Sequence, residues 1–162
     1  MQCINWRNSI LDNPYPVILN LATKSVAVIG GGHVAARKIK SLLSAGASVT
    51  VISPDLSSQI DKKAVCWVKR AYLYGDITDM DIVIACTDDP VVNQQVTADA
   101  THFQLVNNAS NKGQSDFFNV AEVENNHFLF TVSTKGQSPA MAKTIKKKLA
   151  AWLESQEWFR KE

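Results

Sequence analysis

The chain has 162 residues, enough for one domain or for one domain with a small appendage. Hydrophobic residues make up 46% of it and charged residues 20%, which is typical of a globular protein and excludes a disordered chain. The net charge of +2 gives no indication of nucleic-acid binding.

The cysteine content and the lack of long apolar runs indicate the cellular compartment in which we expect the protein. The three cysteines, Cys3, Cys66 and Cys86, have no C-x-x-C spacing, which favours reduced thiols over a disulfide framework. No apolar run approaches the roughly 20 residues that span a bilayer, and the first sixteen residues lack the apolar region of a signal peptide. We therefore expect a cytoplasmic protein that binds neither nucleic acid nor membranes.

The first two thirds of the chain predict strands that alternate with helices. A short apolar run at 24–30 ends in glycine, and apolar residues at helical spacing follow over 33–45, where Gly46 stops the helix. A second helix is predicted over 89–100. The remaining strands are predicted at 48–53, 65–70, 81–86 and 103–107. Nearly continuous β-branched strands indicate an α/β fold with a parallel sheet covered on both faces.

The pattern changes after Phe117. Two β-rich runs flank Asn125 and Asn126, which tolerate left-handed backbone and so predict an antiparallel hairpin. One long helix then begins with Ser138 as N-cap and Pro139 at its first position. Its predicted apolar stripe consists of Met141, Ile145, Leu149, Trp152 and Leu153. A hairpin and one helix cannot bury themselves alone, so this part packs on the first half or on another copy of the chain.

A glycine-rich loop joins the first strand to the first helix. Gly30, Gly32 and Ala35 fit the pattern G-x-G-x-x-A, with Gly31 between the two key glycines. In this context the first glycine permits the tight turn, the second lets main-chain N–H groups approach a pyrophosphate, and the small third residue lets helix pack on strand. The alternative is a plain tight turn between strand and helix.

Two further strand ends are candidates for nucleotide contacts. Ser53 stands where an acid would bind the adenosine ribose, and Asp55 follows two residues later. No arginine is present there for a 2′-phosphate, which favours NAD over NADP, although Asp55 is equally suited to cap the next helix. Thr87 and Asp88 follow the strand at 81–86, where they are placed to line the cleft, to cap the next helix, or to do both.

Six segments occur in this order along the chain: "YPVILNL", "GGGHVAARK", "AGASVTVISPD", "ACTDDPVVNQQV", "LVNN" and "VSTKGQSPAMAKTIKKKL". Together they resemble the precorrin-2 dehydrogenase/sirohydrochlorin ferrochelatase family, which also supplies the N-terminal module of siroheme synthases. The resemblance implies a Rossmann-like fold and oxidation of precorrin-2 to sirohydrochlorin with NAD. Some members also insert Fe²⁺ or Co²⁺ into the macrocycle. It further implies an NAD-binding Rossmann domain at 1–116 and a dimerisation and tetrapyrrole-binding region at 117–162, in a homodimer.

The resemblance also assigns site residues by position. It places nucleotide contacts on the glycine loop with His33 and Val34, and on Pro54 and Asp55. The implied contacts to the tetrapyrrole are Asn107, Ser133, Thr134, Lys135 and Ser138, where Lys135 replaces a glycine and Ser138 also caps the helix. No stable metal site is predicted, because the histidines are far apart and no Cys/His spacing suggests one.

The largest departure from the family lies in the loop after the fifth strand. Ser110 stands where the family has the aspartate regarded as catalytic, and a serine hydroxyl is no general base near neutral pH. Three rescues are open: Asp116 supplies the carboxylate, His127 serves as the base, or the reaction needs little base. The substitution also motivates another reading, a tetrapyrrole-binding or chelatase-only protein. A Rossmann-type nucleotide-sensing module would explain the glycine loop but not the C-terminal segments.

Overall fold

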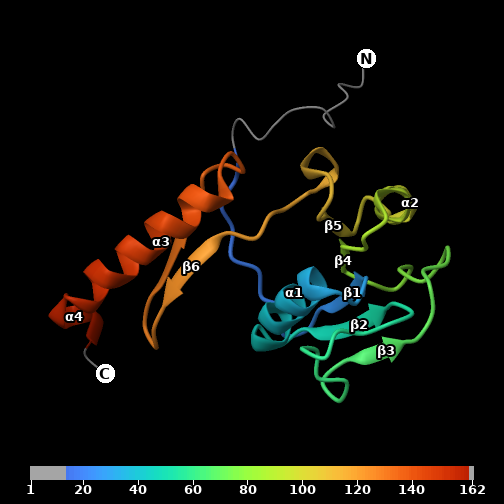
Figure 1. The fold of residues 1–162 in the computed structure, drawn as a ribbon, viewed down its shortest axis with the longest axis horizontal. Helices are drawn as coiled ribbons and strands as arrows, with labels where there is room; N and C mark the ends of the chain where they lie inside the picture. The colour runs from blue at the N-terminus through green and yellow to red at the C-terminus, as the bar shows by residue number, and fades with distance from the viewer. Residues whose placement is uncertain (1–13, 161–162) are drawn as a thin grey trace. The chain divides into compact units, whose positions relative to one another are not determined.

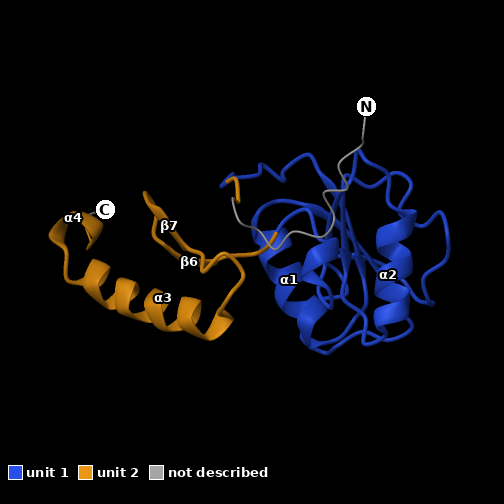
Figure 2. Cartoon of the chain, turned by 90° about the horizontal axis from the view of Figure 1, so that it is seen from above, with its two compact units in different colours: residues 1–10, 16–117 blue, residues 11–15, 118–162 orange. Residues whose placement is uncertain are grey.

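The computed structural model describes residues 14–160, which fall into two compact units (Figure 2). We call residues 16–117 the sheet unit and residues 118–160 the hairpin–helix unit. Cys3 and nearly all of the segment tested for a signal peptide lie outside the described residues. Within residues 14–160, no helix is both long enough and apolar enough to cross a bilayer.

The sheet unit is built on five parallel strands in the order β3-β2-β1-β4-β5 (Figure 1). Their bounds are β1 Ser25–Ile29, β2 Ser48–Ile52, β3 Cys66–Val68, β4 Ile82–Ala85 and β5 Leu105–Asn108. The predicted α/β class and parallel sheet are confirmed. Because β1 lies between β2 and β4, the strand order reverses at the β1/β4 boundary, where open α/β sheets bind ligands beyond the carboxyl ends of their strands.

Two helices cover opposite faces of this sheet, α1 (His33–Ser44) and α2 (Pro90–Asp99), as Figure 2 shows. Alternate residues of β1 serve the two cores, as the two-residue period of a strand requires. Val26 and Val28 join the core that contains α1, whereas Ala27 and Ile29 join the core that contains Val96 of α2. The two faces of the sheet are therefore buried by different helices.

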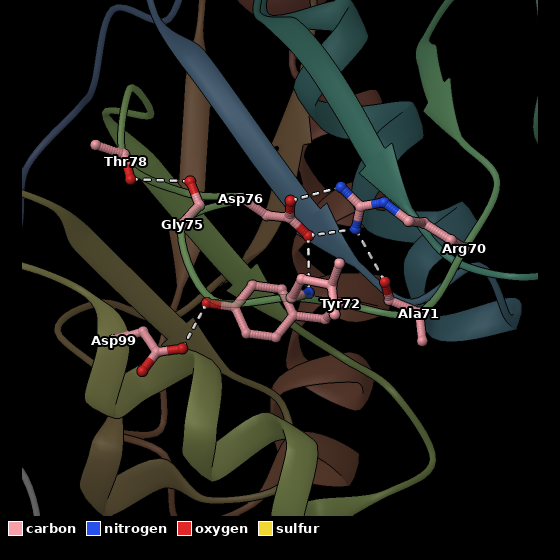
Figure 3. Close-up of polar contacts among 8 residues, drawn as sticks. Arg70, Ala71, Tyr72, Gly75, Asp76, Thr78 and Asp99 are labelled. Atoms are coloured by element: carbon pink, nitrogen blue, oxygen red, sulfur yellow. Dashed lines mark hydrogen bonds and ion pairs between the residues drawn. The ribbon is translucent and has the colours of Figure 1, made fainter.

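The connection from β3 to β4 crosses the α2 face without a helix and is held by polar contacts (Figure 3). Arg70 forms two hydrogen bonds of 2.7 Å with the carboxylate of Asp76, which also accepts the Leu73 N–H. The Tyr72 hydroxyl donates to Asp99 of α2 at 2.8 Å. Burial, followed by the bond to Asp99, raises the pKa of Tyr72. These contacts substitute for the helix that normally fixes such a crossover.

The fifth strand starts later than the predicted 103–107. Phe103 is exposed and lies in a turn, and the buried Gln104 side chain donates to the main-chain oxygens of Ile77 and Met80. Gln104 thus anchors the end of the β3–β4 connection. The third strand is likewise shorter than 65–70, because only Cys66–Val68 pair with β2.

The hairpin–helix unit contains β6 (Ala121–Glu124) and β7 (Leu129–Val132), paired antiparallel as predicted. The predicted left-handed asparagines are wrong, since among residues 14–160 Lys135 is the one non-glycine residue with positive φ. The Asn125 side chain instead accepts the N–H groups of His127 and Phe128, at 2.9 and 2.8 Å, and so closes the turn. An asparagine side chain that mimics a turn in this way removes the need for left-handed backbone.

The C-terminal helix is two helices, α3 (Pro139–Glu154) and α4 (Glu157–Arg160), rather than the single helix expected. Ser155 ends α3 with its main-chain N–H bonded to the Trp152 oxygen, and its side chain donates to the same oxygen. A serine that bonds the main chain locally competes with helix continuation. The start of α3 is confirmed, because the Ser138 hydroxyl accepts the Met141 N–H at 3.2 Å.

Candidate functional site

The glycine loop lies at the β1/β4 boundary, and each of its three glycines meets different surroundings. Gly30 has φ +115°, and a Cβ there would come within 2.6 Å of the Cys86 oxygen at the end of β4. A Cβ on Gly31 would collide with the Asp55 main-chain oxygen and lie 2.9 Å from Ser53 Oγ. A Cβ on Gly32 would meet no atom within 4 Å. The first two glycines therefore serve close packing, whereas the third leaves open space.

The N-terminus of α1 differs from those of α2 and α3. Gly32 is its N-cap and no side chain caps it, whereas Asp89 caps α2 and Ser138 caps α3. Uncapped N–H groups at a helix start, with the positive end of the helix dipole behind them, form an anion site. Open space at Gly32 beside these N–H groups fits the pyrophosphate of a dinucleotide.

The residues predicted to contact the nucleotide near this loop lie at the start of α1 and directly after β2. His33 begins α1 and its Nδ1 is 3.3 Å from Gln59 Oε1, while Val34 is exposed on the first turn. Pro54 and Asp55 follow β2 and are exposed. The Ser57 N–H donates to the Gly31 oxygen at 2.7 Å, which fixes the loop after β2 against the glycine loop.

Thr87 and Asp88 follow β4 at the same edge, but neither caps α2. Asp89 is the N-cap, with its carboxylate accepting the Val91 N–H at 2.8 Å. The prediction of Thr87 or Asp88 as cap is wrong by one or two residues, because the Thr87 hydroxyl is hydrogen-bonded to the main chain of Asp89 and to Asn93 instead.

Two adjacent asparagines of β5 point to opposite faces of the sheet. Asn107 pairs with Ile84, on the α1 side, and accepts a 2.8 Å bond from the Lys38 ammonium while donating to the Phe117 oxygen at 2.7 Å. Burial lowers the pKa of Lys38. Asn107 was predicted to bind the tetrapyrrole, and it is 4% exposed with its amide bonded to Lys38 and Phe117.

Asn108 points to the α2 side, where it bonds to a second buried asparagine, Asn93, and to Ser110. Its Oδ1 accepts from the Ser110 N–H, the Ser110 hydroxyl and the Asn111 N–H at 2.8–3.1 Å. Asn93 is fully buried and connects the Thr87 main chain with Ser110 Oγ. Sequence reasoning missed Asn93, although a polar residue on the otherwise apolar inner face of the predicted helix could have indicated it.

Asp116 connects the loop after β5 back to that strand. Its Oδ2 accepts the Val106 N–H at 2.8 Å, and its own N–H donates to the Val106 oxygen at 2.8 Å. The residue remains exposed. The structure therefore brings Ser110 and Asp116 into one loop, which is also held by Ser115, whose hydroxyl accepts the Asn108 N–H at 2.9 Å.

In the hairpin–helix unit the predicted tetrapyrrole contacts form the turn that enters α3. The Thr134 hydroxyl accepts the Ser138 N–H and donates to the Ser138 oxygen, and Ser133 Oγ accepts the Lys135 N–H. Lys135 has φ 51°, the left-handed region that favours glycine. Four of the five predicted contacts thus share one short turn.

Of the two free thiols among the described residues, Cys66 is exposed and Cys86 is buried. Burial raises the pKa of the Cys86 thiol to about 11, so the thiolate that reacts with electrophiles is scarce at neutral pH. Within the described part of the chain, no group of three or more His, Cys, Asp or Glu side chains is arranged to hold a metal ion.

Comparisons with known proteins place the chain in a family. Residues 17–121 match a family model described as putative NAD(P)-binding. A precorrin-2 dehydrogenase of Bacillus subtilis is 33% identical over 80% of this chain and 83% of its own length, and one of Priestia megaterium is 34% identical over 85% and 70%. A siroheme synthase of Actinobacillus pleuropneumoniae is 33% identical, but the chain spans only 30% of that protein. The solved structure of SirC, precorrin-2 dehydrogenase, superposes with a TM-score of 0.77 at 32% identity, over 85% of this chain and 70% of the other.

Proposed function

The chain belongs to the precorrin-2 dehydrogenase and siroheme synthase family, and from this premise we propose that it oxidises precorrin-2 to sirohydrochlorin with NAD as the hydride acceptor. Membership makes it an NAD-binding oxidoreductase of siroheme biosynthesis. The observation that carries the proposal is the uncapped N-terminus of α1 at Gly32, at the same sheet edge as the loop of Ser110 and Asp116.

Bound NAD supplies the hydride acceptor, and the chain's own residues bind and orient it. The N–H groups of the first turn of α1 bind the pyrophosphate, with His33 and Val34 on that turn. Pro54 and Asp55 lie on the adenosine side, and Thr87 and Asp88 line the opposite wall. The absence of an arginine at the end of β2 agrees with an unphosphorylated ribose.

The second loop supplies polar groups for the proton that leaves with the hydride. Ser110 stands at the family's aspartate position and its hydroxyl is bonded to Asn93 and Asn108. Asp116 keeps one carboxylate oxygen for a ligand while the other accepts the Val106 N–H. Asp116 is accordingly the proton acceptor in this proposal, with Ser110 in contact with the reacting pair. In the hairpin–helix unit, Ser133, Thr134, Lys135 and Ser138 are the proposed contacts to the tetrapyrrole. Asn107 of the sheet unit is not retained, because it is 4% exposed and its amide is bonded to Lys38 and Phe117.

The direct test is an anaerobic assay with precorrin-2 and NAD⁺ that follows sirohydrochlorin absorbance. Asp116→Asn should lower kcat by about 10²–10⁴, the usual contribution of a general base. The variant keeps an oxygen that accepts the Val106 N–H, so the loop remains bonded to β5 and only the base is lost. Ser110→Asp should raise kcat, because it restores a carboxylate. Wild-type turnover no faster than the uncatalysed reaction would overturn the proposal.

A second candidate is a tetrapyrrole-binding or chelatase-only protein, and the Ser110 hydroxyl favours it because no carboxylate stands at that position. It predicts tight binding of sirohydrochlorin without NAD-dependent turnover. Insertion of Fe²⁺ or Co²⁺, followed by the spectrum of the metallated macrocycle, separates the two candidates. Metal insertion that persists in Gly32→Ala while oxidation is absent in wild type would support the second.

The homodimer is part of the proposal, as is a cytoplasmic location, where the free thiols of Cys66 and Cys86 stay reduced. In the hairpin–helix unit large apolar side chains are exposed: Phe128 at 41%, Leu129 at 45%, Met141 at 57%, Ile145 at 41% and Trp152 at 54%. Such a surface is typical of an interface between copies. Light scattering should give twice the mass of one chain, and Ile145→Asp should give the single mass.

A further inference from the structure

The surroundings of the Ser110 hydroxyl determine to which neighbour it donates a hydrogen bond and from which it accepts one. Two buried asparagines, whose amides are oriented by main-chain groups, make this determination. The first is Asn93. Its Oδ1 accepts the Thr87 N–H at 2.9 Å and its Nδ2 donates to the Thr87 oxygen at 3.0 Å. A main-chain N–H only donates and a main-chain oxygen only accepts, so the orientation of this amide is determined. The second N–H of Asn93 Nδ2 points to Ser110 Oγ at 3.2 Å, where Ser110 must accept.

The second asparagine determines the other side of the hydroxyl. Asn108 Oδ1 accepts the main-chain N–H groups of Ser110 and Asn111 at 3.0 and 3.1 Å, which identifies that atom as the oxygen. Ser110 Oγ lies 2.8 Å from the same oxygen and must therefore donate to it. Asn108 is 3% exposed and its Nδ2 is held by Thr97 Oγ1 and the Asn93 oxygen, so the amide cannot turn over without losing these bonds.

A hydroxyl has one hydrogen and two lone pairs. The hydrogen is committed to Asn108 and one lone pair to Asn93, which leaves one lone pair on an exposed residue. The remaining position of Ser110 Oγ can accept a hydrogen bond but cannot give one. A ligand carboxylate or carbonyl oxygen has no hydrogen to offer it, whereas a ligand N–H has.

We propose that Ser110 is a recognition site for a ligand N–H donor, in contrast to the acid–base role that a carboxylate would have there. The inference rests on the proposed function, which supplies two ligands with such a donor. They are NAD, through its carboxamide, and a free-base tetrapyrrole, through its ring N–H. Asn93 and Asn108 are positioning residues, because they act through the Ser110 hydroxyl.

The test measures binding by calorimetry, so it does not depend on turnover. Ser110→Ala removes the acceptor from an exposed residue and should weaken binding of the N–H ligand about three- to tenfold, the usual contribution of one neutral hydrogen bond. 3-Acetylpyridine adenine dinucleotide has a methyl group in place of the carboxamide N–H₂, and cobalt sirohydrochlorin has no ring N–H. The affinity of the matching analogue should be the same for wild type and Ser110→Ala.

The comparison of each ligand with its analogue identifies which ligand supplies the N–H donor. A loss confined to NAD, absent with its acetylpyridine analogue, assigns the donor to the carboxamide. A loss confined to free-base sirohydrochlorin, absent with the cobalt complex, assigns it to the macrocycle. Ser110→Thr keeps the hydroxyl and should retain most of the affinity. Ser115→Ala is the matched loop control, because disturbance of the loop should weaken parent and analogue alike.

The inference is overturned if Ser110→Ala weakens an analogue as much as its parent ligand, or changes the affinity of none of the four ligands. Wild type that binds the ligands without oxidising precorrin-2 would contradict the proposed dehydrogenase function while the binding arms still decide the role of Ser110. Wild type that binds none of the four ligands would overturn both.

Discussion

The sheet unit and the hairpin–helix unit solve the burial of apolar side chains in different ways. In the sheet unit β1 and β4 are buried almost completely and two helices cover the sheet. Across residues 118–160 Leu153 is the only buried apolar side chain, while Met141, Ile145 and Trp152 are exposed. The first unit carries its own apolar core, whereas the second leaves large apolar side chains exposed.

This difference bears on function. A dinucleotide site needs main-chain groups held within tenths of an ångström, and the glycine loop obtains this precision from two buried strands that meet at Gly30 and Cys86. In the turn at 133–138, by contrast, Thr134 bonds the Ser138 main chain and Ser133 Oγ accepts the Lys135 N–H, so the hydrogen bonds of its side chains are short-range. We therefore expect the cofactor site to be preformed in one chain.

The largest effect should come from core truncation in each unit. Ile84→Ala removes a fully buried side chain from β4 and should cost about 4 kcal/mol of unfolding free energy. Leu153→Ala should cost about 3 kcal/mol, and hydrogen exchange should show the loss only in the hairpin–helix unit. Faster exchange of β1 and β4 amides in Leu153→Ala would contradict an effect confined to the hairpin–helix unit.

Two glycine variants separate packing from ligand space within the sheet unit. Gly31→Ala brings a methyl group against the Asp55 oxygen and should lower stability by about 3 kcal/mol in thermal unfolding. Gly32→Ala meets no atom within 4 Å, so stability should be nearly unchanged. Its methyl group occupies the space assigned to the pyrophosphate, and NAD affinity should fall on the order of tenfold. Unchanged NAD affinity in Gly32→Ala would remove the main support for the cofactor site.

In the hairpin–helix unit Lys135→Gly relieves a side chain held at φ 51°. Because left-handed backbone is unfavourable for residues with a Cβ, the variant should stabilise that unit by about 1 kcal/mol. If Lys135 also binds tetrapyrrole carboxylates, KM for precorrin-2 should rise in the same variant. Thermal unfolding and steady-state kinetics measure the two effects separately, and a loss of stability would show that the turn requires lysine.

The smallest effect concerns the polar crossover in Figure 3. The hydrogen bond from Arg70 lowers the pKa of Asp76, so this pair stabilises the fold above the unfolded carboxyl pKa of about 3.9. That stabilisation is lost as pH falls through the lower folded-state value. Asp76→Asn should cost about 0.5 kcal/mol at neutral pH, and its difference from wild type should vanish in acid. Substitution of Asp79, an exposed carboxylate on the same crossover, by asparagine is the control for the loss of one negative charge.

Much of the fold followed from local pattern. The glycine loop, the first helix and the strands at β1, β2 and β4 were predicted because buried parallel strands are apolar throughout and glycine marks their turns. Several errors arose where a hydrogen bond from one side chain fixed the local structure. Asn125 closes its turn with its amide, Asp89 rather than Thr87 caps α2, and Ser155 ends α3.

The sequence by itself determined the residue types at each position of the site, including serine at 110, where the resemblance to the family implies a carboxylate. Only the tertiary structure decided what that serine can do, because its hydroxyl lies between Asn93 and Asn108 of two separate elements. The reason is physical: hydrogen-bond polarity depends on which donors and acceptors surround an atom. Asn93, 17 positions away along the chain, becomes a neighbour of Ser110 only when α2 packs on β5.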